Sequence, residues 1–394
     1  MSDVSLRGRG ARGAVPALAL GTFAVGTDAF VVAGFLPELA ADLGVPTATA
    51  GQAVTVFAAA YALLSPVLAT LTARLPRRRL LVGALVGLGA ANLASALAPD
   101  FGVLLASRVA AAAAAAAFTP NAGAVAASLV RPERRARALA VVVGGLTVAT
   151  ALGVPLGGVV GEWTGWRWAL GAVAGLALLV AGAVAALLPY LPGNPRVPLR
   201  ERLAVLRHPA VRAILPLTVL GMAAAYTVYA YSVPALAAVG LTARDTAWAL
   251  GLYGIGAVLG NLGAGLATDR VGGVRVLRVG YVLMAAGLAG LGALAAGGVR
   301  MPVLVGVLMV AWGAGSWCQT PPQQHRLIAA APGEAPLVVA LNSSAIYAGI
   351  GAGTLTGGLT ARSGAVTMYA TAAGLAVLAL VYLLLTAGER TASW

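Results

Sequence analysis

Two charged residues stand inside long apolar stretches of this 394-residue chain. Asp28 lies about three residues beyond the middle of the stretch 14–36, or ~4–5 Å at 1.5 Å per residue. Arg108 lies about seven residues, or ~10 Å, from the middle of 103–127, towards the same side. A charge at such a depth costs roughly 3 kcal/mol on insertion scales, so it is expected to face a cavity or a partner. A carboxyl group held away from water can take up and release a proton as its surroundings change.

The arginine side chain is long enough to span most of the gap that separates these two positions. We therefore predict that Asp28 exchanges protons and that Arg108 is its neighbour. A structural aspartate bonded to an adjacent helix remains an alternative for Asp28. The corresponding alternative for Arg108 is a side chain that extends to the outer membrane interface.

The composition places both residues in a membrane protein. The chain is 60% hydrophobic and 10% charged, whereas soluble domains carry about a quarter charged residues. A membrane-crossing helix needs about 20 mostly apolar residues. Twelve stretches meet this length, near 14–36, 50–72, 80–98, 103–127, 138–160, 168–189, 213–238, 246–267, 276–297, 302–321, 337–359 and 365–386. The sequence thus predicts an all-α membrane protein with twelve transmembrane helices.

The basic residues predict the orientation of these helices. All 26 are arginine, and with a cytoplasmic amino terminus 21 of them fall on the cytoplasmic side. Four, Arg167, Arg244, Arg300 and Arg362, fall on the outer side. This asymmetry predicts that both termini and the central loop are cytoplasmic. Arginines spread over short loops do not form the basic face that nucleic-acid binding requires, despite the net charge of +14.

Cysteine and histidine are too scarce for a metal or disulfide framework. Cys318 is the one cysteine, and His208 and His325 both fall in predicted loops. No metal and no cofactor is therefore expected.

The two halves of the chain echo one another. Leu36-Pro37 near the end of the first span and Val233-Pro234 near the end of the seventh lie 197 residues apart. Gly157-Gly158 and Gly357-Gly358 lie 200 residues apart. These offsets predict a six-helix bundle over 1–191, a polar cytoplasmic linker over 192–212 and a second six-helix bundle over 213–394. Such halves are a known transporter architecture, with the substrate site between them at mid-membrane.

Short motifs accompany the spans. GLATDRVG at 265–272 follows the eighth span, and RLPRRR at 74–79 follows the second. LLASR at 104–108 begins the fourth span, and GVPLGG at 153–158 lies in the fifth. GTDAF at 26–30 lies in the first. On these motifs the whole chain resembles the major facilitator superfamily, and within it the twelve-span drug:proton antiporters, including bacterial exporters of the chloramphenicol and sugar-efflux types.

This resemblance implies roles for particular residues. It assigns Arg108 to proton exchange, and it assigns the fifth span to sealing the interface between the halves on the inner side in exporters. The gating and packing residues that it implies are Arg74, Gly144, Gly153, Pro155, Gly157, Gly158, Asp269 and Arg270. The sequence departs from the family pattern at Ala73 and Pro76, where an aspartate and a glycine are usual, so the salt bridge of the loop at 72–79 is in doubt.

Polar and aromatic residues within the spans are candidates for lining a substrate cavity, since ligand sites are mostly apolar with a few placed polar groups. The candidates are Tyr61, Asn121, Tyr226, Tyr229, Tyr253, Trp312, Gln319, Asn342 and Tyr347. Hydrogen bonding between helices, or an aromatic belt at the membrane interface, is the alternative role for each.

The interpretation that joins these features is proton-coupled export of a small, largely apolar, drug-like molecule. The exporter is expected to act as a single chain in the cytoplasmic membrane of a bacterium, driven by the proton gradient through one acid. A proton-coupled symporter that takes up a sugar or an organic acid is the alternative. An enzyme is not expected, because one aspartate and one arginine do not supply the clustered groups that membrane catalysis needs.

Overall fold

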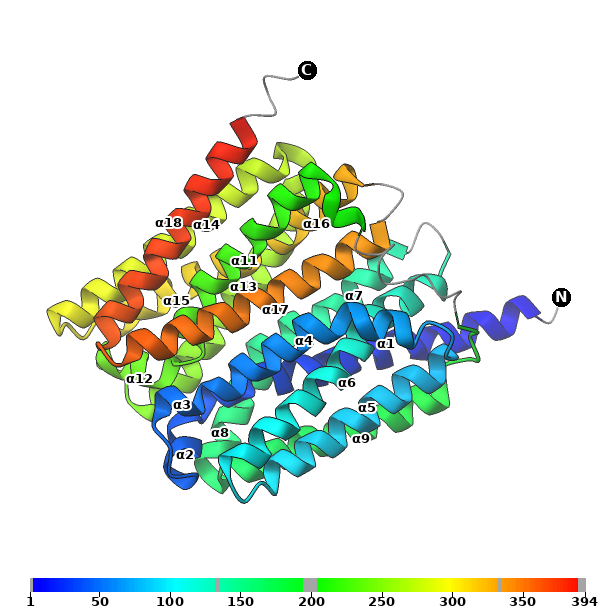
Figure 1. Ribbon diagram of the computed structural model, residues 1–394, viewed down its shortest axis with the longest axis horizontal. Coiled ribbons are helices and arrows are strands. Elements are labelled where there is room, and N and C mark those ends of the chain that lie inside the picture. Colours follow the sequence, from blue (N-terminus) through cyan, green and yellow to red (C-terminus); the bar gives the residue numbers. More distant parts are fainter. Residues whose placement is uncertain (1–2, 132–134, 194–203, 332–334, 389–394) are drawn as a thin grey trace.

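The computed structural model describes residues 3–131, 135–193, 204–331 and 335–388 (Figure 1). Within these ranges every regular element is helical, and twelve helical stretches are long and apolar enough to cross a membrane. The prediction of an all-α chain with twelve spans is confirmed. The described stretches agree with the predicted spans to within a few residues at most of their ends.

The first half packs as one bundle, in which α5 lies against α6 and α9, and α1 lies against α7 and α9. Its elements are α1 (Asp3–Phe30), the 3₁₀ turn η1 (Val31–Gly34), α2 (Leu36–Asp42), α3 (Thr47–Ala50), α4 (Gln52–Leu71), α5 (Arg77–Ala96), α6 (Phe101–Ser128), α7 (Arg135–Val148), the π-helical η3 (Ala149–Gly153), α8 (Val154–Thr164) and α9 (Trp166–Leu187).

The second half packs in the same way, with α11 against α17 and α18, and α13 against α15. Its elements are η4 (Val205–Arg207), α11 (Pro209–Tyr229), α12 (Ser232–Ala238), α13 (Ala243–Val271), α14 (Gly273–Gly297), α15 (Pro302–Trp317), α16 (Thr320–Ala330), α17 (Ala335–Ala361) and α18 (Ala365–Gly388). The helix α11 begins four residues before the predicted boundary at 213. Residues 194–203 of the predicted linker lie outside the described residues.

The bundle has two ends, which we name by what lies there. The terminal end holds both chain termini, and the distal end holds α2, α3 and α12, together with the far end of α8 (Figure 1). Because the chain crosses between the ends twelve times, Arg167 and Arg244, in the first turns of α9 and α13, and Arg300 and Arg362, in loops, all lie at the distal end. Among the described residues, Arg74, Arg77, Arg270 and Arg275 lie at the terminal end.

Prolines explain two breaks that the hydropathy pattern did not show. The first and seventh spans were expected to run unbroken to 36 and 238, but α1 ends at Phe30 and α11 ends at Tyr229. Pro37 and Pro234 follow within the next short helices, α2 and α12. A proline ring clashes with the carbonyl group four residues earlier and removes one helical hydrogen bond, so the continuous helix ends before it.

The same constraint acts in the fifth and tenth spans. The π-helical η3 directly precedes Pro155, and the wider turn accommodates the missing hydrogen bond. The tenth span divides at Pro321 into α15 and α16, and α16 continues to Ala330 rather than ending at 321. His325 therefore lies in a helix and not in the predicted loop. Four other prolines, Pro16, Pro66, Pro120 and Pro216, stay inside continuous helices.

Glycines of the fifth span bring its backbone against the first span. A Cβ atom on Gly153 would lie 2.1 Å from the hydroxyl oxygen of Thr27, and one on Gly157 would lie 2.1 Å from Val31. Gly158 faces Gly34, where a Cβ atom on Gly34 would lie 3.1 Å from the Cα of Gly158. These three glycines therefore allow the first and fifth spans, both in the first half, to pack closely against each other.

The halves meet from the middle of the bundle to the distal end. In this region α3 and α4 lie against α17, η3 and α8 lie against α13, and η1 and α2 lie against α12. The hydroxyl group of Tyr231 donates a hydrogen bond to the carbonyl oxygen of Ala48 at 3.3 Å. A Cβ atom on Gly254 of α13 would lie 2.2 Å from the Cα of Ala151 in η3. The fifth span meets the second half through α7, η3 and α8, which all lie against α13. The inner-side seal that the resemblance implied stays a prediction.

We predict that Gly254→Val prevents the distal end from closing, because the added side chain collides with the backbone of η3. The reporter is Thr246→Cys in a Cys318→Ser background, since Thr246 is 5% exposed and lies between the halves. In detergent, a water-soluble maleimide should label this cysteine faster in the Gly254→Val protein. Gly251→Val is the matched control, because nothing lies within 4 Å of a Cβ there. Equal labelling rates in the two variants would contradict the prediction.

Candidate functional site

Asp28 and Arg108 form an ion pair between the first and fourth spans. The Nη1 atom of Arg108 donates to Oδ1 of Asp28 at 2.5 Å, and its Nη2 atom donates to the main-chain carbonyl oxygen of Asp28 at 2.9 Å. Both residues are 0% exposed, and they are the only charged side chains buried among the described residues. Both carry unused hydrogen-bonding capacity, because Oδ2 of Asp28 and Nε of Arg108 have no hydrogen-bond partner in the described structure.

The end of α1 explains why the arginine binds there. Asp28 lies in the last turn of α1, whose final carbonyl groups have no helical partner. The carboxyl end of a helix carries a partial negative charge that favours a cation. The break before Pro37 thus provides Arg108 with a main-chain acceptor as well as a carboxylate.

A row of aromatic rings leads from this pair into the second half. The Cζ atom of Arg108 lies 4.7 Å from the centre of the Phe57 ring, within the range of a cation–π contact. Tyr347, on α17 of the second half, lies 6.1 Å from Phe57 and stacks on Tyr61 with ring centres 3.7 Å apart. Contacts to the ion pair therefore cross the interface between the halves.

A second set of rings surrounds Phe30, two residues beyond Asp28. We call it the central aromatic cluster, and it consists of Phe30, Tyr226, Tyr229, Tyr253, Trp312 and Trp317. Phe30 belongs to the first half, and its ring centre lies 5.5 Å from that of Tyr226 and 6.2 Å from that of Trp317 in the second. Tyr226 and Tyr229, predicted to share a helix face, have ring centres 5.1 Å apart.

The aromatic residues retain polar atoms that the protein does not use. The hydroxyl groups of Tyr226, Tyr229 and Tyr347 and the indole N–H of Trp312 are buried without a hydrogen-bond partner among the described residues. A buried, unsatisfied polar group costs about 1–3 kcal/mol, so such groups are rare unless they serve a ligand or water. The cluster offers flat apolar surfaces with several hydrogen-bond donors, next to an ion pair whose charges cancel.

Three of the predicted cavity residues are engaged elsewhere. The amide oxygen of Asn121 accepts a hydrogen bond from Arg77 at 2.8 Å, near the terminal end of the first half. The side chain of Gln319 accepts from Tyr281 at 3.1 Å, and that of Asn342 accepts from Thr218 at 3.0 Å. These bonds join helices within one half, which is the alternative left open for each residue.

The loop residues implied by the resemblance form no ion pair among the described residues. Arg74, Asp269 and Arg270 are all exposed at the terminal end. In the loop at 72–79, Arg77 makes structural contacts. Its side chain donates to Asn121, and its main-chain N–H donates to the carbonyl oxygen of Leu191 at 2.9 Å. Gly144 is half-buried with open space beside it, so it does not pack closely as the other glycines of the fifth span do.

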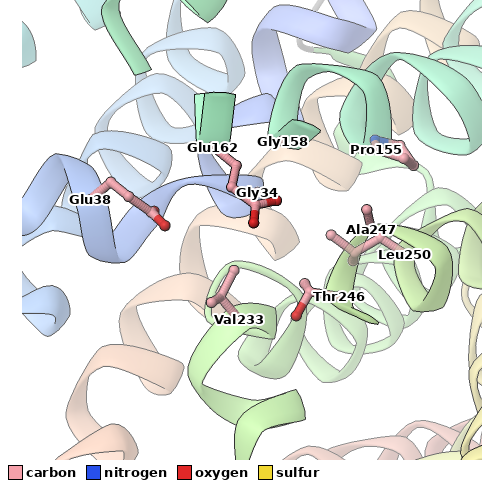
Figure 2. A pocket seen from close by; sticks show the side chains of 9 residues that line it. All are labelled: Gly34, Glu38, Pro155, Gly158, Glu162, Val233, Thr246, Ala247 and Leu250. Carbon is pink, nitrogen blue, oxygen red and sulfur yellow. The ribbon is translucent and has the colours of Figure 1, made fainter. Parts of the chain in front are cut away.

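A hollow at the distal end contains carboxylates that the sequence analysis missed. It is small, with a cavity volume of about 20 Å³. It lies between Gly34, Glu38, Pro155, Gly158 and Glu162 of the first half and Val233, Thr246, Ala247 and Leu250 of the second. The exposed side chains of Glu38 and Glu162 point toward the space between the halves (Figure 2). Nearby, a hydrogen bond from Arg167 lowers the pKa of Asp42.

Phe30, Phe57 and Trp317 were also missed as site residues. Phe30 stands two residues from Asp28 and adjoins a helix break marked by Pro37, which was a usable signal. Phe57 lies four residues before Tyr61, on the same face of α4. Trp317 lies five residues after Trp312, and nothing in its spacing distinguishes it from a membrane-interface residue.

Comparisons with known proteins agree with this geometry. The model of the Major Facilitator Superfamily matches residues 18–239. The chloramphenicol resistance protein of Streptomyces lividans is 35% identical over 350 residues, covering 87% of this chain and 88% of that protein. The inner membrane transport protein YdhP of Escherichia coli K12 is 31% identical over 376 residues, covering 95% of each.

Solved structures show the same fold. The human organic anion transporter MFSD10 (TETRAN) aligns with a TM-score of 0.69 at 19% identity, covering 95% of this chain and 99% of that one. A bacterial homologue of the human lysosomal transporter Spinster, in an inward-facing and unoccupied conformation, aligns with a TM-score of 0.67 at 17% identity, covering 96% of each chain. The chain therefore belongs to the major facilitator superfamily and is a multi-pass membrane transporter rather than an enzyme.

Proposed function

We propose that this transporter exports a small, uncharged, largely aromatic compound in exchange for a proton. The observation that carries the proposal is the buried Asp28–Arg108 pair, which adjoins a cluster of aromatic residues shared by both halves. The relative of Streptomyces lividans is a chloramphenicol resistance protein, which favours export of a drug. The bacterial cytoplasmic membrane is the proposed location.

The chemistry of the central aromatic cluster supports the class of substrate. Stacked and edge-on rings bind a flat apolar group. The unused hydroxyl groups of Tyr226, Tyr229 and Tyr347 can bond to carbonyl, hydroxyl or nitro oxygens of the substrate. Because Asp28 and Arg108 neutralise each other, the site offers no net charge that would select an anion or a cation.

The proposed coupling uses one proton per cycle. Asp28 is ionised while it is bound to Arg108, and protonation weakens that bond by removing the negative charge. An external proton therefore releases Arg108 and favours the change of access, and loss of the proton to the cytoplasm restores the pair. Exchange of one proton for a neutral molecule moves one charge inward, so a potential of 100 mV supplies about 2.3 kcal/mol in addition to the pH gradient.

The arrangement of arginines supports an orientation of the transporter in the membrane. With the arginine-rich terminal end at the cytoplasm, the closed distal end faces outward. In this conformation Tyr231 and Gly254 block release to the outside. No cofactor takes part in the proposed cycle, and a single chain supplies every group that it uses.

We predict that Asp28→Asn abolishes proton-driven transport while substrate binding persists. The amide cannot ionise, but its main-chain oxygen still accepts from Arg108, and the aromatic cluster is unchanged. Purified protein in liposomes with an imposed pH gradient should show no chloramphenicol-dependent proton flux. Asp28→Glu should retain part of it, and the exposed Glu38→Gln is the matched control with full flux. Wild-type flux in Asp28→Asn would refute the role of Asp28, and proton flux in the same direction as the substrate would favour the uptake symporter.

We predict that Arg108→Met lowers stability in a pH-dependent way. The variant leaves Asp28 buried beside Tyr347 without a cation, so ionisation of Asp28 becomes costly. The free energy of unfolding in detergent should fall by about 3–5 kcal/mol at alkaline pH and by less as acid protonates Asp28. The double variant Asp28→Asn/Arg108→Met should show no such pH dependence. A deficit that is the same at every pH would mean that Arg108 acts by packing alone.

We predict that Tyr226→Phe changes substrate preference without affecting the fold. The substitution removes one buried hydroxyl that has no protein partner and keeps the ring beside Phe30. Binding of a substrate that accepts a hydrogen bond there should weaken by roughly 3–30-fold, whereas purely apolar dyes should bind as before. Tyr281→Phe is a control at a buried tyrosine outside the cluster. Equal affinities across a panel of ligands would exclude Tyr226 from the substrate site.

A further inference from the structure

A groove on the second half lies outside the substrate site. It has a volume of about 300 Å³ between α13 and α14, with α15 as its floor. Small residues create the hollow, and larger ones form its rims. Its lining consists of Leu259, Gly260, Gly263, Ala264, Ala267, Val271, Arg275, Val276, Val279, Gly280, Leu283, Ala314 and Cys318.

The groove has the length of one membrane leaflet. Along α13 it extends from Leu259, near the middle of the span, to Val271 at the terminal end, which is ~18 Å at 1.5 Å per residue. Half of a bilayer's hydrocarbon core measures ~15 Å. Leu262 and Leu266 beside it are more than 60% exposed, so this face of the helix is directed to lipid.

Positive charge gathers where the groove reaches the terminal end. Arg275 is exposed and forms part of the lining, and Arg270 and Arg278 are exposed on the adjoining turns. Asp269 is the acidic residue in this region, and it does not line the groove. Clustered arginines at the end of a transmembrane helix attract anionic lipid headgroups.

We propose that this groove binds one anionic phospholipid of the leaflet at the terminal end. One acyl chain lies along the small residues of α13, and the phosphate group contacts Arg275. A second copy of this chain is a poor occupant, because its own terminal end is rich in arginine and the net charge is +14. The lipid site is separate from the proposed substrate site, since it lies on the lipid-facing surface of the second half.

Two substitutions test the two parts of the site separately. Arg275→Gln removes the charge at the mouth. Gly263→Leu fills the groove, and nothing lies within 4 Å of a Cβ at Gly263, so the new side chain occupies lipid space without disturbing the protein. Gly265→Leu is its matched control, with equally open surroundings outside the groove. Arg79→Gln is the charge control, at an exposed arginine in the first turn of α5.

Native mass spectrometry of the full-length protein, titrated with phosphatidylglycerol or phosphatidylcholine, measures the binding. We expect one phosphatidylglycerol to bind more tightly than phosphatidylcholine. Arg275→Gln should weaken phosphatidylglycerol binding by about fivefold, and Gly263→Leu should abolish the tight site. Both controls should bind as the wild type does.

Equal binding of the two lipids, or unchanged binding in Gly263→Leu, would overturn the proposal. A lipid-independent dimer that Gly263→Leu disrupts would also overturn it, by showing that a second copy occupies the groove.

Discussion

The structure depends on the ion pair between Asp28 and Arg108, because no other buried charge is present among the described residues. Burying two charges in an apolar bundle is expensive unless their attraction and additional hydrogen bonds offset the loss of water. Here the carboxylate, a main-chain carbonyl at the end of α1 and the face of Phe57 all surround one guanidinium group. The first and fourth spans must therefore keep their relative depth for the pair to form.

The breaks in the helices are part of the same arrangement. Because α1 stops at Phe30, the carbonyl group of Asp28 is free to accept from Arg108, and Phe30 itself reaches Tyr226 and Trp317 in the other half. The charged site and the aromatic cluster therefore adjoin within the last turn of a single helix. A change in the ionisation of Asp28 acts directly on the end of the helix that contacts the proposed substrate site.

Much of the fold followed from the sequence, because span length and arginine placement are strong constraints in a membrane. The number of spans and the identity of the two buried charges required only hydropathy and counting. The breaks after Phe30 and Tyr229 did not follow, since prolines at Pro16 and Pro66 leave their helices continuous and Pro37 and Pro234 do not. Whether a proline ends a helix depends on the packing around it.

The cavity residues were harder to identify for a similar reason. Polarity alone could not distinguish Asn121, which bonds to Arg77 within its own half, from Tyr347, which crosses to the other half. The distinction depends on which helix face meets which neighbour, and a single sequence does not contain that pairing. Aromatic residues within the spans were a better signal for the site than polar ones. Four of them, Tyr226, Tyr229, Tyr253 and Trp312, lie in one cluster.

The contact between the halves at Gly254 has a consequence for the speed of opening. Gly254 meets the main chain around Ala151, so little but backbone atoms touch at this point. Surfaces of this kind separate without any side chain having to leave a fitted pocket or change its rotamer. This contact can therefore part and re-form with little reorganisation, so the aromatic side chains that cross the interface elsewhere, such as Tyr61 and Tyr347, set the cost of opening.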